Sequence, residues 1–116
     1  MLGLGALPAH AENYRDTSLT GWSAGKESTR WHDNNNDNAS TSVRFRDCFS
    51  EGSVGFKSAG LKLWKDVFGP DENKGSRTNR CNTSSWGDQS AGDYYFELIG
   101  ISSGQVLTVH SIMISW

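Results

Sequence analysis

Apolar and polar side chains alternate along several short segments of this chain, which is the pattern of β-strands with one packed face and one solvated face. The clearest such segments are residues 41–48, 61–68 and 93–101. Residues 106–116 are rich in β-branched side chains and predict a final strand. We expect one core to form from the apolar members of these segments: Val43, Phe45, Leu61, Leu63, Tyr94, Phe96, Leu98, Ile112 and Ile114.

Clusters of Gly, Pro, Asn, Asp and Ser separate these segments and predict turns, the densest lying at residues 33–38, 69–75 and 86–92. Weaker strands are predicted at the remaining short extended segments, which are residues 28–32, 54–57 and 76–82. No segment has the apolar spacing of an amphipathic helix. The sequence therefore predicts an all-β fold, an antiparallel β-sandwich of about seven strands.

The start of the chain divides into two segments before this domain. Residues 1–11 carry no charge and end in Ala9-His10-Ala11, which is typical of the end of a signal peptide and predicts export. Residues 12–27 are polar and contain two glycines and Trp22, so we expect an extended N-terminal arm that is mobile when unbound. The single β-sandwich domain is then expected to span residues 28–116.

The two cysteines, Cys48 and Cys81, are expected to form a disulfide, because an exported chain meets an oxidising environment. A metal site would require ligand pairs such as C-x-x-C, which are missing here. A pair of free buried thiols is the alternative.

Length and charge restrict the classes of function. The chain has 116 residues, one domain's worth, and a formal net charge of -2, so no broad basic surface is available for nucleic acid or anionic lipid. No apolar stretch approaches the roughly 18 residues of a membrane span. We therefore expect neither nucleic acid nor membrane as a partner.

Residues 33–38 alternate oxygen-bearing side chains in the manner of a calcium loop, with Asp33, Asn35 and Asp37 as the candidate ligands. Asn38 stands where such a loop needs glycine, and Arg44 stands where it needs a bidentate Glu. We expect a solvated Asn-rich turn, with a calcium site as the alternative, and no other metal or cofactor.

Catalytic signatures are missing from the sequence. It contains no G-x-S-x-G, H-E-x-x-H or phosphate-binding loop, and the histidines that follow the leader are His32 and His110. On an alternating strand His110 is more simply explained as a partly buried, hydrogen-bonded side chain. We expect the protein not to be an enzyme.

Five tryptophans are a large number for so short a chain. Trp64 and Trp116 fall in predicted strands and are assigned to the core. Trp22, Trp31 and Trp86 lie in or beside polar, glycine-containing segments, where an exposed ring could stack on a sugar or on a partner's side chain. These three are the candidate partner-binding residues.

The segment Ala91-Gly92-Asp93-Tyr94-Tyr95-Phe96 resembles the start of a late strand in immunoglobulin-like and related bacterial sandwiches, where the tyrosine packs back over the preceding turn. The resemblance implies an immunoglobulin-like sandwich. The chain as a whole is similar to small secreted β-sandwich proteins of Streptomyces and its relatives. In size, export, single disulfide and polar N-terminal arm it resembles the small adaptor of umbrella toxin particles, which joins a lectin-bearing subunit to a toxin-bearing stalk.

Three functions remain open from the sequence. The first is a secreted, non-enzymatic adaptor that binds other secreted proteins through its arm, by strand addition or groove insertion, within an extracellular toxin complex. The alternative is a carbohydrate-binding module that uses exposed tryptophans. An inhibitor of a secreted enzyme is a third, which the sequence does not distinguish from the adaptor.

Overall fold

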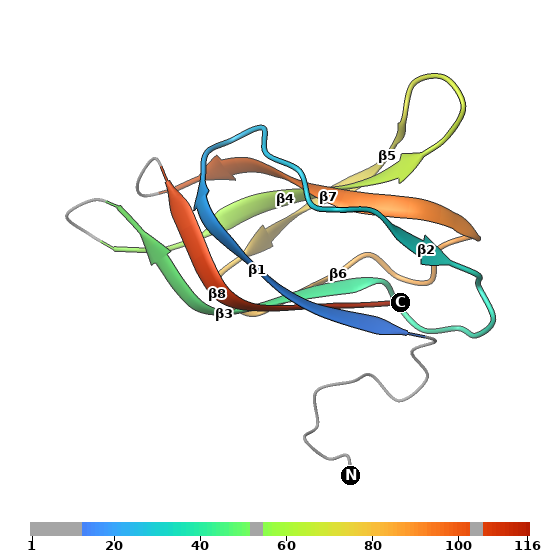
Figure 1. The fold of residues 1–116 in the computed structure, drawn as a ribbon, viewed down its shortest axis with the longest axis horizontal. Coiled ribbons are helices and arrows are strands. Elements are labelled where there is room, and N and C mark those ends of the chain that lie inside the picture. Colours follow the sequence, from blue (N-terminus) through green and yellow to red (C-terminus); the bar gives the residue numbers. More distant parts are fainter. Residues whose placement is uncertain (1–12, 52–54, 103–105) are drawn as a thin grey trace, which may run out of the picture.

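The computed structural model describes residues 13–51, 55–102 and 106–116, so the predicted signal-peptide segment lies outside the described residues. The described residues form eight strands and no helix (Figure 1). The strands are β1 (Tyr14–Trp22), β2 (Trp31–Asp33), β3 (Ser42–Ser50), β4 (Ala59–Asp66), β5 (Glu72–Asn79), β6 (Thr83–Ser85), β7 (Gly92–Ile101) and β8 (Leu107–Ser115).

The strands build two four-stranded antiparallel sheets, with orders β1-β8-β3-β6 and β2-β7-β4-β5. The first strand pairs with the last, the second with the seventh, the third with the sixth and the fourth with the fifth. This is the order of a jelly roll, in which a long hairpin is wrapped into two sheets. It differs from the immunoglobulin order, where the first, second, fourth and fifth strands share one sheet. The all-β, antiparallel prediction is confirmed, whereas the sheets do not have the immunoglobulin order.

One core lies between the two sheets. Every residue predicted for it is at most 1% exposed. The rings of Phe45 on β3 and Phe96 on β7 meet across the core with their centroids 6.1 Å apart. Other aromatic pairs of the core have similar centroid distances, 6.0 and 6.5 Å. The core residues of β3, β4 and β7 stand at every second position, which explains why the sequence identified these inward faces correctly.

The predicted N-terminal arm is wrong in its main part, because Tyr14–Trp22 is strand β1 of the domain itself. It pairs with β8 over its length, and Asn13 and Trp116 exchange backbone hydrogen bonds of 2.9 and 3.1 Å. Leu19 is buried at 4% exposure. The register shifts on either side of Leu19, so its inward residues do not follow a period of two and the strand was hidden in the pattern. The domain therefore includes β1 rather than starting at residue 28.

Other strand boundaries also differ from the predictions. β5 starts at Glu72, so the predicted turn at 69–75 shrinks to a loop of residues 67–71. Residues 55–57 form no strand, and residue 54 lies outside the described part. The short polar strand β6 was missed, because three residues carry too little pattern to recognise.

The predicted disulfide is confirmed. Cys48 on β3 and Cys81, between β5 and β6, are joined with an S–S distance of 2.08 Å and a Cα–Cα distance of 5.9 Å. The bond links the β1-β8-β3-β6 sheet to the connection that leaves the other sheet.

Candidate functional site: a braced hairpin tip

The β4–β5 hairpin projects beyond the two sheets and ends in a loop of residues 67–71 (Figure 1). Phe68 lies in this loop with a relative exposure of 107%, which means that its ring has no protein neighbour covering it. Gly69 adopts a positive φ of 90°, and Pro70 follows it, so the chain reverses direction beside the ring. A large apolar side chain is thus held at the most exposed part of the hairpin.

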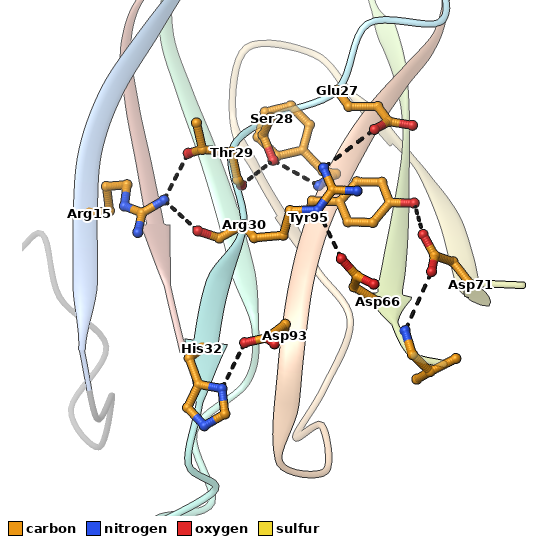
Figure 2. A network of polar contacts seen from close by, with 12 residues as sticks. Arg15, Glu27, Ser28, Thr29, Arg30, His32, Asp66, Asp71, Asp93 and Tyr95 are labelled. Carbon is orange, nitrogen blue, oxygen red and sulfur yellow. Dashed lines mark hydrogen bonds and ion pairs between the residues drawn. The ribbon is translucent and has the colours of Figure 1, made fainter. Parts of the chain in front are cut away.

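Asp71 closes the base of the loop. Its carboxylate accepts a hydrogen bond from the phenol O–H of Tyr95 on β7 and one of 3.4 Å from the backbone N–H of Val67 (Figure 2). One side chain therefore connects the two sides of the loop to the neighbouring strand. This restricts the loop without covering Phe68.

Arg30 forms a second brace at the end of β4. Its Nε donates to Asp66 at 3.1 Å, its Nη1 lies 3.5 Å from Glu27, and its guanidinium carbon lies 3.9 Å from the centre of the Tyr95 ring (Figure 2). These ion pairs are about half exposed, and each such pair contributes only about 0.2–1 kcal/mol. Their combined effect is on orientation rather than on stability, because they hold the end of β4, the ring of Tyr95 and the segment before β2 in one arrangement.

The environment of Tyr95 changes its ionisation. Although its side chain is on the outer face of the sheet, it is only 4% exposed. Burial, and next the hydrogen bond to Asp71, raise the pKa of Tyr95 well above its usual value. The phenol therefore stays protonated, and keeps donating to Asp71, to a more alkaline pH than an exposed tyrosine would.

The same outer face carries a half-buried tryptophan. Trp64 on β4 donates its indole N–H to Glu97 Oε1 at 2.9 Å, and Lys62 Nζ lies 5.1 Å from the centre of its ring. Nearer β2, His32 Nδ1 and Asp93 Oδ1 lie 2.7 Å apart (Figure 2). Aromatic, cationic and carboxylate groups thus share this face of the β2-β7-β4-β5 sheet. The sequence assigned Trp64 to the core, which is wrong, because it lies on the outward side of its strand.

The three candidate partner-binding tryptophans do not form an exposed surface. Trp31 is 2% exposed and stacks against the rings of Tyr94 and Trp116. Trp86 is 6% exposed and donates its indole N–H to Gly75 O at 2.9 Å. Both belong to the core, since polar neighbours along the chain did not prevent their rings from turning inward.

Trp22 is half-buried and packs on Phe96 at a centroid distance of 6.0 Å. It helps line a cavity of about 120 Å³ between β1 and the segment before β2, together with Leu19, Phe96 and Ile112. Trp22 is therefore an edge of the core rather than an anchor on a mobile arm.

The candidate calcium ligands are used within the loop itself. Asp33 accepts the N–H of Asn35 at 2.7 Å, and Asp37 accepts the N–H of Ala39 at 2.9 Å. These are turns of the kind that Asp and Asn form with the following backbone, and Asn35 has a φ of 54°. In the described part of the chain no group of three His, Cys, Asp or Glu side chains is arranged to hold a metal ion.

The tyrosine of the quoted motif behaves as the resemblance implied. Tyr94 donates its phenol O–H to the carbonyl of Ser90 at 2.6 Å, so it packs back over the turn that precedes β7. Burial raises the pKa of Tyr94. The motif therefore marks local strand and turn geometry, which this chain uses in a jelly roll.

Comparison with protein-family models, curated proteins and solved structures found no match for this chain. Over the ranges that the structure describes, no helix is long and apolar enough to cross a membrane.

Phe68 is the functional candidate that the sequence interpretation missed. Its signal was present, since Phe68 ends the predicted strand 61–68 and stands immediately before the turn cluster that begins with Gly69-Pro70. A large apolar residue in a turn has no inward face to fill, so its exposure can be expected from the pattern. The partners that brace the loop, Arg30 and Tyr95, are too distant in sequence to be found in that way.

Proposed function

We propose that this protein is a non-enzymatic binding protein, an adaptor whose β4–β5 hairpin inserts Phe68 into an apolar pocket of another protein. The observation that carries this proposal is the complete exposure of Phe68 on a braced loop. Aromatic residues dominate the energetics of protein interfaces, and burying a Phe side chain contributes roughly 1.5–3 kcal/mol. A loop already held in place loses less conformational freedom on binding, which favours affinity.

The extracellular setting is part of the same proposal. A disulfide in a small domain supports an oxidising compartment. The resemblance to the adaptor of umbrella toxin particles is supported by size and by the single disulfide. The mobile arm no longer supports this resemblance, because Tyr14–Trp22 is a strand of the domain.

Photocrosslinking from the hairpin tip tests the proposal. Phe68 is replaced by p-benzoylphenylalanine, and the protein is irradiated with the secreted proteins of its source cells. We expect one or a few defined crosslinked partners, and Phe68→Ser should weaken their capture by the unmodified protein about tenfold or more, as for an interface hot spot.

The matched control places the same crosslinker at Tyr14, an aromatic residue on β1 that is 46% exposed. We expect no crosslink to the same partner from that position. Equal products from positions 14 and 68, or undiminished capture by Phe68→Ser, would show that the hairpin tip is not the contact.

Glycan binding is the second candidate, and Trp64 favours it. Its half-buried ring has an indole N–H fixed by Glu97, next to Lys62, which together offer a stacking surface and polar groups for sugar hydroxyls. A glycan array probed with the protein, Trp64→Ala and Phe68→Ser separates the two functions. Binding lost only with Trp64→Ala would support a carbohydrate-binding module, and an array without signal would remove it.

A further inference from the structure

A second feature lies where β3 ends and β8 begins, at the end of the molecule opposite the β4–β5 loop (Figure 1). A groove of about 330 Å³ opens there, lined by Phe49, Ser50, Glu51, Val106, Thr108 and His110. Phe49 is 55% exposed, and its ring lies 5.0 Å from that of His110 with a tilt of 46°. The groove thus presents an open aromatic face beside an apolar and hydroxyl-bearing wall.

Glu51 supplies the charge of this groove. Its backbone N–H donates to Val106 O at 3.2 Å, which ties it to the opposite strand at the groove. None of the ion pairs found among the described residues involves Glu51. Arg46 and Asp47, which precede the groove along β3, carry opposite charges, and Glu51 is the one carboxylate among the described residues that line the groove.

We propose that this groove binds an arginine side chain of a partner polypeptide. A guanidinium plane stacks on an aromatic face and pairs with a carboxylate through two parallel N–H···O bonds, and Phe49 and Glu51, which both line this groove, offer these two interactions. The aliphatic stem of the arginine lies against Val106 and Thr108. A lysine ammonium offers neither stacking nor a two-pronged pairing, so arginine is the better match.

This inference is independent of the hairpin proposal, because it uses other residues at the other end of the molecule. If both are correct, the protein has two contact surfaces that face away from each other. Such an arrangement is what a protein needs in order to join two partners.

A small-molecule probe tests the groove without knowledge of the partner. The isotope-labelled protein is titrated with Nα-acetyl-arginine methylamide and, separately, with the citrulline analogue, which has the same shape but no charge. We expect saturable shifts of the Phe49, Thr108 and His110 resonances with arginine, at a dissociation constant on the order of millimolar, and binding about tenfold weaker or more with citrulline.

Two variants locate the interaction. Glu51→Gln should weaken arginine binding about tenfold through loss of the charged pair, and Phe49→Leu should weaken it several-fold, about threefold to fivefold, through loss of the aromatic face. Glu72→Gln is the matched control, since Glu72 is an exposed carboxylate of the hairpin. Equal shifts with citrulline and arginine, no saturable shift, or equal losses in Glu72→Gln and Glu51→Gln would each overturn the proposal.

Discussion

The contacts that Arg30 and Asp71 make to hold the hairpin in place meet at Tyr95. Its ring carries the guanidinium of Arg30 at 3.9 Å, and its hydroxyl donates to Asp71. Its position on an outward-facing side of β7 suggests exposure, yet the side chain is buried because Arg30 and the hairpin cover it. Sequence alternation cannot show this, since the cover comes from residues far away along the chain.

Removing the Tyr95 hydroxyl should change how stability depends on alkaline pH. The pKa of Tyr95 is raised in the folded protein, so its contribution is fully present below the ordinary tyrosine pKa of about 10 and is lost as the pH rises above it. In Tyr95→Phe we expect the loss of unfolding free energy above about pH 10 to be less steep by up to roughly 1.4 kcal/mol per pH unit.

Urea denaturation at pH 7 and across pH 9 to 11 measures this effect. Tyr14→Phe, at an exposed position, serves as the control for removing a phenol. An unchanged alkaline slope in Tyr95→Phe would mean that the unfolded and folded states hold this proton equally well.

At the scale of elements, the question is whether Tyr14–Trp22 is a mobile arm or a strand of the domain, and the structure shows the edge strand β1. It contributes Leu19 and Trp22 to the core and pairs with β8, so its residues act on stability. The sequence prediction failed here because the two inward residues, Leu19 and Trp22, stand three positions apart, which does not fit a period of two. The register shifts around Leu19 accommodate this spacing. By contrast, β3, β4, β7 and β8 were predicted well, since their core residues stand at every second position, with one break in β8 between Val109 and Ile112.

Trp22→Ala should therefore lower the melting temperature rather than partner affinity. The ring packs on Phe96 at the edge of the core, and truncating a half-buried aromatic is expected to cost about 1–3 kcal/mol. For a domain of this size that corresponds to a decrease of roughly 5–15 °C. Thermal unfolding followed by circular dichroism measures it, with Tyr14→Ala as the control for β1.

A melting temperature equal to that of the control would contradict the assignment of β1 to the domain. It would return the segment to the role of a free arm. The crosslinking experiment with Phe68 is unaffected by this outcome, because the hairpin lies on the other sheet.

At the scale of the whole molecule, the two sheets and their shared core followed from the sequence, whereas the strand order did not. The alternation of apolar and polar residues indicates which side of a strand is packed, but the pattern does not depend on which strand lies next to it in the sheet. The pairing of β1 with β8 and of β2 with β7 joins segments from opposite ends of the chain. The composition of the groove depends on this order, because β3 and β8 both line it, which is why Glu51 was not identified as a site residue. Phe68 was missed for a local reason, since it was assigned to the end of the predicted strand 61–68.

The disulfide is the covalent counterpart of this long-range organisation. Cys48 belongs to the β1-β8-β3-β6 sheet, and Cys81 follows β5 of the other sheet, with 33 residues of separation between them. In the chain-entropy model, closing a loop of this length stabilises the folded state by roughly 3.5–4 kcal/mol. The loop encloses the whole of β4 and β5, so the bond restricts the hairpin that carries Phe68 in the unfolded chain.

We expect the Cys48→Ser/Cys81→Ser variant to lose about that free energy of unfolding in urea at pH 7, and reduction of the unmodified protein to produce a similar loss. Reductant should have no further effect on the double variant, which serves as the control. A loss below about 1 kcal/mol would mean that the reduced, unfolded chain is already nearly as restricted as the oxidised one, as residual structure in the unfolded state would cause.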